Sequence, residues 1–210
     1  MEAFKEYLGQ EFEEINLLGL KRKLPLYNVE KNLWILANEA LCFGCDIEFT
    51  RKVGKKLAER IAPFKPDILL APEAKSLGLA FCIAENLGHK EFAIARKNSK
   101  LLTKGALKVE IQSITTPESQ FLCLDHINRE KIEGKRIVLF DDVISSGGTI
   151  KGLMKLSKKA GAEVVVVSTV WIEGKAVKED LIQGELNDKL VYLDILPIYS
   201  KNNAKKFAKI

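Results

Sequence analysis

The segment from Ile137 to Ile150 constrains this chain more than any other. It reads Ile-Val-Leu-Phe-Asp-Asp-Val-Ile-Ser-Ser-Gly-Gly-Thr-Ile. An apolar, β-rich run ends in two adjacent carboxylates, passes through a turn rich in hydroxyl groups and glycine, and enters a segment suited to a helix. Carboxylates accept hydrogen bonds from sugar hydroxyls, and the backbone N–H groups at a helix N-terminus favour phosphate. The segment therefore predicts a strand–turn–helix site for a sugar phosphate.

Apolar runs alternate with amphipathic helical patterns through most of the chain. Strands are expected at 67–71, 91–96, 136–141, 163–171 and 190–193, with a strand pair at 108–114 and 120–124, and helices at 48–61, 77–87, 149–160 and, as a short one, 177–184. This alternation predicts an α/β fold with a mainly parallel central sheet flanked by helices. Ligands of such sheets bind at the carboxyl ends of the strands. We expect the turns 72–78, 96–104 and 141–149 to converge there on one pocket.

The N-terminal part follows a different pattern. Over residues 2–18 the apolar side chains fall at helical spacing, which predicts a helix; they are Phe4, Leu8, Phe12, Ile15 and Leu18. Residues 21–32 are basic and contain Pro25, so we expect an irregular segment. Trp34 is expected in the core. No internal repeat or second domain is visible, and a single domain over residues 1–210 is predicted.

The composition excludes several classes of protein. The 210 residues include 33 Lys and Arg against 28 Asp and Glu, a net charge of +5, which suits an anionic substrate and is too dispersed for nucleic acid. No apolar run approaches the ~20 residues that a membrane helix needs. The acidic, amphipathic N-terminus does not resemble a signal peptide, so a cytoplasmic location is expected.

The cysteines leave one question open. Among Cys42, Cys45, Cys82 and Cys123, the first two have the Cys-x-x-Cys spacing of metal or redox sites. No second such pair and no histidine pair completes a zinc set, so reduced thiols are the default expectation.

Other phosphate sites fit less well. The chain has no Gly-x-x-x-x-Gly-Lys-Ser/Thr sequence, and no Gly-x-Gly-x-x-Gly follows a strand, which disfavours P-loop enzymes and dinucleotide folds. An ordinary capped turn would account for the serines and glycines. It would not account for Asp141 and Asp142, whose like charges repel unless a ligand or cation offsets them.

Residues 138–149 resemble the phosphoribosyl pyrophosphate signature of type I phosphoribosyltransferases, most closely that of the purine salvage enzymes for adenine and xanthine. The resemblance runs from about Asp67 to Trp171 and more loosely over the N-terminal segment. It implies the type I phosphoribosyltransferase fold, with an N-terminal helix and hood over about residues 1–50, a core over 51–200 and a basic tail over 201–210. It also implies a homodimer and a reaction that joins a purine base to phosphoribosyl pyrophosphate.

The resemblance also implies roles for particular residues. Asp141 and Asp142 would hold the ribose hydroxyls, and Arg96 and Lys97 would meet pyrophosphate. The 5′-phosphate would bind to Ser145, Ser146, Gly147, Gly148 and Thr149; pyrophosphate to Ala74, Lys75, Ser76 and Lys100; and the base to Val143, Ile144 and Trp171. Residues 98–118 would form a flexible loop over the substrate. Mg²⁺ would be the cofactor, held mainly by substrate oxygens and by no protein side chain directly.

The identity of the base stays open between adenine and xanthine. Residues 113–120 resemble the xanthine enzymes, with Thr115 where the adenine enzymes carry a glutamate. Gly174, which separates Glu173 from Lys175, departs in turn from the xanthine pattern. Two other readings remain: a regulator that senses phosphoribosyl pyrophosphate without catalysis, and a plain α/β domain whose glycine turn is structural.

Overall fold

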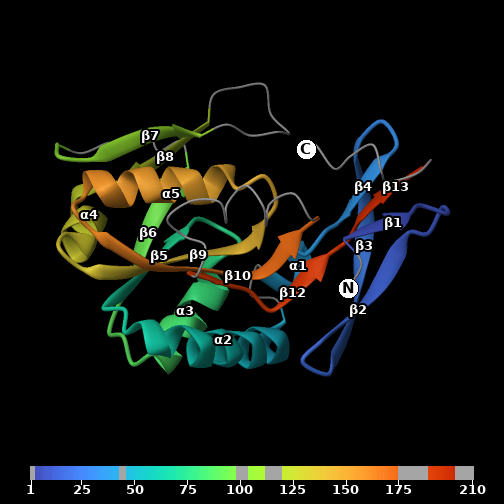
Figure 1. Cartoon of the computed structure of the whole chain (residues 1–210), viewed down its shortest axis with the longest axis horizontal. Helices are drawn as coiled ribbons and strands as arrows, with labels where there is room; N and C mark the ends of the chain where they lie inside the picture. Colours follow the sequence, from blue (N-terminus) through green and yellow to red (C-terminus); the bar gives the residue numbers. More distant parts are fainter. Residues whose placement is uncertain (1–2, 43–45, 98–103, 112–119, 175–188, 202–210) are drawn as a thin grey trace.

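The computed structural model describes residues 3–42, 46–97, 104–111, 120–174 and 189–201. Two sheets lie beside each other (Figure 1). The larger has the strand order β11-β10-β9-β5-β6-β8-β7, with β12 also paired to β10. Its strands are β5 (Ile68–Pro72), β6 (Ala93–Lys97), β7 (Leu107–Ile111), β8 (Gln120–Leu124), β9 (Arg136–Ile144), β10 (Glu163–Glu173), β11 (Leu190–Val191) and β12 (Asp194–Leu196).

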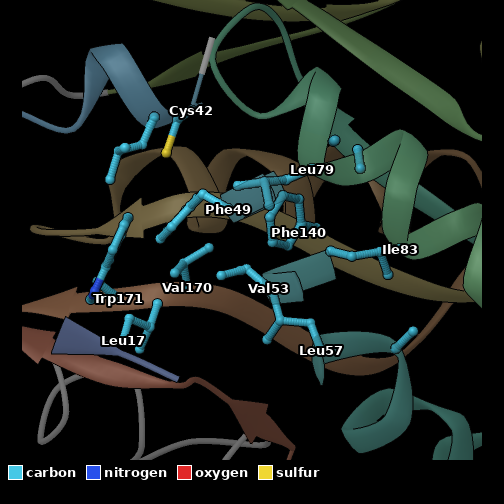
Figure 2. Close-up of a cluster of buried hydrophobic side chains, with 14 of the residues drawn as sticks. Leu17, Cys42, Phe49, Val53, Leu57, Leu79, Ile83, Phe140, Val170 and Trp171 are labelled. Atoms are coloured by element: carbon cyan, nitrogen blue, oxygen red, sulfur yellow. The ribbon is translucent and has the colours of Figure 1, made fainter. Parts of the chain in front are cut away.

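Helices cover both faces of this sheet. In Figure 1, α5 (Gly148–Lys159) lies on one face, and α2 (Ile47–Ile61) and α3 (Leu77–Asn86) lie on the other. Side chains along β9 alternate between the two faces: Val138 and Phe140 join the cluster under α2 and α3, whereas Ile137 and Leu139 join the cluster under α5. Figure 2 shows part of the first cluster, in which Trp171 stacks on Phe49 with ring centroids 5.6 Å apart.

The structure confirms the predicted α/β core. Strands β10, β9, β5 and β6 run parallel to one another, while β8 pairs antiparallel with both β6 and β7. Helix α4 (His126–Ile132), which Asp125 caps at its N-terminus, was not predicted. Strand β9 continues to Ile144 and so includes both aspartates, three residues beyond the predicted end. The short helix predicted at 177–184 and the turn between β7 and β8 lie outside the described residues.

The predicted N-terminal helix is wrong, and so is the irregular segment after it. Residues 4–36 instead form β1 (Phe4–Glu6), β2 (Phe12–Leu17), β3 (Leu20–Glu30) and β4 (Leu33–Leu36). Ile15 and Leu17 are buried with exposed residues on either side, which is the period of a strand. Leu18 and Gly19 both have positive φ, 55° and 81°, and form the two-residue turn of a β-hairpin. That alternation also satisfied helical spacing at a few positions, which misled the prediction.

These strands form the second sheet, which we call the hood. Its order is β1-β13-β4-β3-β2, so β13 (Ile198–Ser200) pairs parallel with β1 and antiparallel with β4. Pro25 lies where β3 changes partner: residues up to Pro25 pair with β2, and residues from Leu26 pair with β4. Trp34 is half-buried and stacks on Tyr7 at 3.8 Å. The hood therefore combines segments from both ends of the sequence.

No helix among the described residues is long and apolar enough to cross a membrane.

Candidate active site

The two adjacent aspartates lie buried near the carboxyl end of β9. Ser76 immediately precedes α3. Its hydroxyl donates to Asp141 Oδ1 at 2.7 Å, and the Asp142 backbone N–H donates to Ser76 Oγ at 3.3 Å. The Thr169 hydroxyl of β10 donates to the Asp142 carbonyl oxygen at 3.0 Å. Burial, and next the charge of Asp142, raises the pKa of Asp141 well above its usual range. The fold thus holds two carboxyl groups side by side at a buried position, where ionising both of them costs free energy.

The hydroxyl-rich turn follows directly. Ser145 and Ser146 are exposed, Gly147 has a left-handed conformation, and α5 begins at Gly148. The first helical turn contains no acidic residue, so its free N–H groups and the helix dipole both favour an anion. The five residues predicted for a phosphate are therefore consecutive, at the start of a twelve-residue helix.

A second turn, after β5, faces the aspartates. It contains Glu73, Ala74 and Lys75, and the peptide bond between Glu73 and Ala74 is cis. Glu73 connects this turn to the end of β6, because its carboxylate accepts from the Lys97 backbone N–H at 2.9 Å and from Arg96 Nε at 3.3 Å. Lys97 lines the same cavity as the aspartates. Arg96 is exposed, and its guanidinium is engaged by Glu73.

The segment that leads out of the hood closes the other side of the cavity. Asn38, which is buried, donates through Nδ2 to Asp142 Oδ2 at 2.8 Å, and Glu39 forms an ion pair with Lys75. Burial is the largest single influence on the pKa of Lys75 and lowers it, but the hydrogen bond with Glu39 and the nearby negative charges together outweigh burial, and the net shift is upward. The sequence analysis assigned neither Asn38 nor Glu39 a role, since no local pattern connects them with partners 104 and 36 positions away.

Glu173 was also missed. It ends β10, is 7% exposed and lines the cavity. Burial raises its pKa, which the hydrogen bond from the Ser145 side chain partly offsets. A glutamate that ends an otherwise apolar strand was the available sequence signal, the same signal that drew attention to Asp141 and Asp142.

Some predicted site residues lie elsewhere. Trp171 is 1% exposed and belongs to the core cluster with Phe49, and Ile144 is equally buried in the cluster under α5. Neither lines the cavity, whereas Val143 does. For Ile144 the reason is strand alternation, because the side chains on either side of Val143 point to the opposite face of the sheet. Trp171 lies in register with Val143, but its ring stacks on Phe49 in the core. Lys100, Thr115 and Cys45 lie outside the described residues.

The cavity has a volume of about 380 Å³. Its apolar part comes from the hood, through Tyr27, Val29 and Ile35, and from Val143. Its polar part contains five carboxyl side chains and two lysines: Glu39, Glu73, Asp141, Asp142 and Glu173, with Lys75 and Lys97. Such a site offers hydrogen-bond acceptors to a hydroxylated ligand, N–H groups to a phosphate, and an apolar surface to a planar ring.

Cys42 is buried next to Asn38, which lines the cavity. Its buried thiol accepts a contact from Asn38 Nδ2 at 3.2 Å, and burial raises its pKa strongly. A raised pKa disfavours the thiolate that metal binding and redox chemistry require. Among the described residues, no group of three or more His, Cys, Asp or Glu side chains is arranged to hold a metal ion.

Comparisons with known proteins agree with this geometry. Residues 47–188 match the phosphoribosyl transferase domain family. The adenine phosphoribosyltransferase of Thermosipho africanus is 35% identical over 137 residues, which are 65% of this chain and 77% of that protein. Xanthine phosphoribosyltransferase 1 of Clostridium perfringens is 27% identical over 161 residues, which are 70% of this chain and 83% of that protein.

The fold has the same relatives. The crystal structure of the adenine phosphoribosyltransferase from Thermoanaerobacter pseudethanolicus superposes with a TM-score of 0.63 at 21% identity, covering 88% of this chain and 95% of that one. The matched family region contains the acidic pair, the hydroxyl-rich turn and the turn after β5. The chain therefore belongs to the phosphoribosyltransferase family, with the type I fold and the sequence relatives of the purine salvage branch.

Proposed function

We propose that the protein transfers the 5-phosphoribosyl group of phosphoribosyl pyrophosphate to adenine or xanthine, releasing pyrophosphate. One observation carries the proposal: the acidic pair, the hydroxyl-rich turn, the Glu73–Ser76 turn and Lys97 line one cavity at the carboxyl ends of three neighbouring strands. A ribose that carries phosphate on one side and diphosphate on the other needs these three kinds of contact at once.

Each part of the cavity has a role in this reaction. Residues 145–149 hold the 5′-phosphate through N–H groups and hydroxyls, and the turn at Ala74 to Ser76 with Lys97 holds the diphosphate. Asp141 and Asp142 hold the ribose hydroxyls. When the base nitrogen bonds to the anomeric carbon and the bond to diphosphate breaks, positive charge develops on the ring. The buried carboxylates stabilise that charge, because they are already oriented and poorly solvated.

A divalent cation fits the charges of the cavity. Five carboxyl groups against two lysines leave too little positive charge for a polyanionic ligand. Oxygen donors are the ligands that Mg²⁺ prefers, and it keeps several substrate and water oxygens when bound. We propose that the diphosphate and ribose oxygens supply most of them, with Asp141 and Asp142 beside the ion. Mg²⁺ would supply charge neutralisation of the leaving group.

The apolar lining of the cavity supports a purine as the acceptor. Tyr27, Val29 and Ile35 of the hood lie across the cavity from the sheet, which contributes Val143. A planar heterocycle between two such walls buries both of its faces. The proposed base site does not include Trp171 and Ile144, because both side chains are buried in the hydrophobic core.

The test is pyrophosphate release with Mg²⁺, phosphoribosyl pyrophosphate and, separately, adenine, hypoxanthine, guanine or xanthine. We expect turnover with adenine or xanthine and none when Mg²⁺ is chelated. Binding of phosphoribosyl pyrophosphate without release from any base would instead favour a sensor. Failure to bind it at all would contradict the proposal. Assembly as a homodimer stays a prediction, which sedimentation analysis tests.

A further inference from the structure

Ser76 occupies a position where a serine usually has a structural role. It immediately precedes α3, and a serine there commonly accepts a hydrogen bond from a free N–H group of the first helical turn. The Ser76 side chain forms no such bond, and the residue already has right-handed helical φ and ψ angles of −77° and −12°. Ser76 is 1% exposed. Because buried polar groups need partners, a buried hydroxyl that does not cap its helix must serve another group.

The hydroxyl lies between the two aspartates. Ser76 Oγ is 2.7 Å from Asp141 Oδ1 and 3.2 Å from Asp142 Oδ1, and it accepts from the Asp142 backbone N–H at 3.3 Å. A hydroxyl has one proton, and the shorter contact has the length of a charge-assisted hydrogen bond, so the proton is donated to Asp141. Asp141 Oδ1 also accepts from the Asp142 backbone N–H at 3.0 Å. Two donors on one oxygen fix the orientation of this carboxylate.

The same hydrogen bond acts on the charge of Asp141. Burial, and next the charge of Asp142, raises the pKa of Asp141. Among the influences that lower this pKa, the hydrogen bond from Ser76 is the largest, and the charge of Lys97 follows. Asp142 has a side-chain donor of its own, Asn38, on the other side of the cavity. The two aspartates are thus held by donors from two different segments of the chain.

Resting on the proposed function, we infer that Ser76 is a positioning residue, whose hydroxyl holds the Asp141 carboxylate in the orientation that stabilises the positive charge developing on the ribose. The resemblance assigned Ser76 to pyrophosphate, but its hydroxyl is engaged by the acidic pair. The turn after β5 then meets the diphosphate through its backbone and through Lys75. Because Ser76 belongs to that turn and Asp141 to β9, one hydrogen bond connects the diphosphate end of the cavity with the ribose end.

Ser76→Ala tests this role, because it removes the hydroxyl without removing a helix cap. A hydrogen bond to a charged group corresponds to a factor of about ten to 150, and the positive charge develops only as the transition state forms. We therefore expect kcat for pyrophosphate release to fall about ten- to 150-fold. The inhibition constant of added pyrophosphate, which carries no ribose, should stay within about twofold of wild type. Ser76→Cys, which keeps a weaker donor of similar size, should recover part of the loss.

Ser157→Ala is the matched control. Ser157 is also buried, and its hydroxyl donates over the same 2.7 Å, to the Leu153 carbonyl oxygen within α5. This variant should leave kcat unchanged. The inference is overturned if Ser76→Ala keeps kcat within about twofold of wild type, or if the inhibition constant of pyrophosphate rises as kcat falls, as loss of a diphosphate ligand would require. An equal loss of kcat in Ser157→Ala would also overturn it. No pyrophosphate release by wild type with any purine would overturn the proposed function, and this inference with it.

Discussion

The two sides of the cavity are built in different ways. The sheet side, which we call the donor side, comes from short continuous segments: residues 72–76 from the end of β5 onward, Lys97 at the end of β6, and residues 141–149 from the last residues of β9 onward. The hood side comes from strands distant in sequence, because β13 must lie between β1 and β4. The donor side is thus encoded locally and the hood side globally. Contacts between Asn38 and Asp142 and between Glu39 and Lys75 join them.

The largest effect should follow from neutralising the acidic pair of the donor side. We expect Asp141→Asn with Asp142→Asn to lower turnover at least about a thousandfold, since one preorganised electrostatic group is worth about 10²–10³ in kcat. The fold should persist, because the substitution removes two buried like charges. Pyrophosphate release measures the first expectation and thermal unfolding the second. Activity close to wild type in a folded double variant would contradict the assigned roles.

A smaller effect should come from the hood contact to that pair. Asn38→Ala removes the donor to Asp142 Oδ2, and a hydrogen bond to a charged group is worth about 1.5–3 kcal/mol. We expect kcat/KM for phosphoribosyl pyrophosphate to fall about ten- to hundredfold. Asn28→Ala is the control within the hood, since Asn28 Nδ2 donates to the carbonyl oxygens of Glu30 and Leu33. If both variants behave alike, the hood does not position Asp142.

The smallest effect should have the opposite sign. Glu39 holds Lys75, which the proposed function assigns to the diphosphate, so Glu39→Gln should free that charge. Partly exposed ion pairs are worth about 0.2–1 kcal/mol, so the KM of phosphoribosyl pyrophosphate should fall by up to about fivefold. Adding Lys75→Met should abolish the gain in a double-mutant cycle. A rise in KM for Glu39→Gln alone would show that the ion pair supports binding.

The same division explains what the sequence could predict. The segments around β5, β6, β9 and α5 were predictable because each strand is a short apolar run, and because a turn and a helix follow β5 and β9 directly in the sequence. The structure brings the residues of those turns into one cavity. Near β9 the sequence predicted which segment forms the site but not which of its side chains reach the cavity. Strand alternation buries Ile144 and leaves Val143 at the cavity.

The hood could not be predicted in this way. Its strands are short, and the helical spacing of Phe4, Leu8, Phe12, Ile15 and Leu18 competed with the strand alternation of Ile15 and Leu17. The pairing of Phe4 with Ile198 cannot be recognised from either segment alone. Asn38 and Glu39 become site residues only once the two sheets lie together. The apolar wall of the proposed base site therefore comes from the part of the fold that local patterns describe least.

The pairing of β1 with β13 also has a consequence for the order of assembly during synthesis. A ribosome that has made the chain as far as Glu173 has synthesised every strand that contributes a donor-side turn. The outer edge of β4 still lacks its neighbour, because Ile198 to Ser200 emerge about 25 residues later, and an open strand edge is a template for wrong pairing. Long-range pairings of this kind also form slowly. The nascent protein can therefore form its sugar-phosphate turns first and complete the hood sheet last.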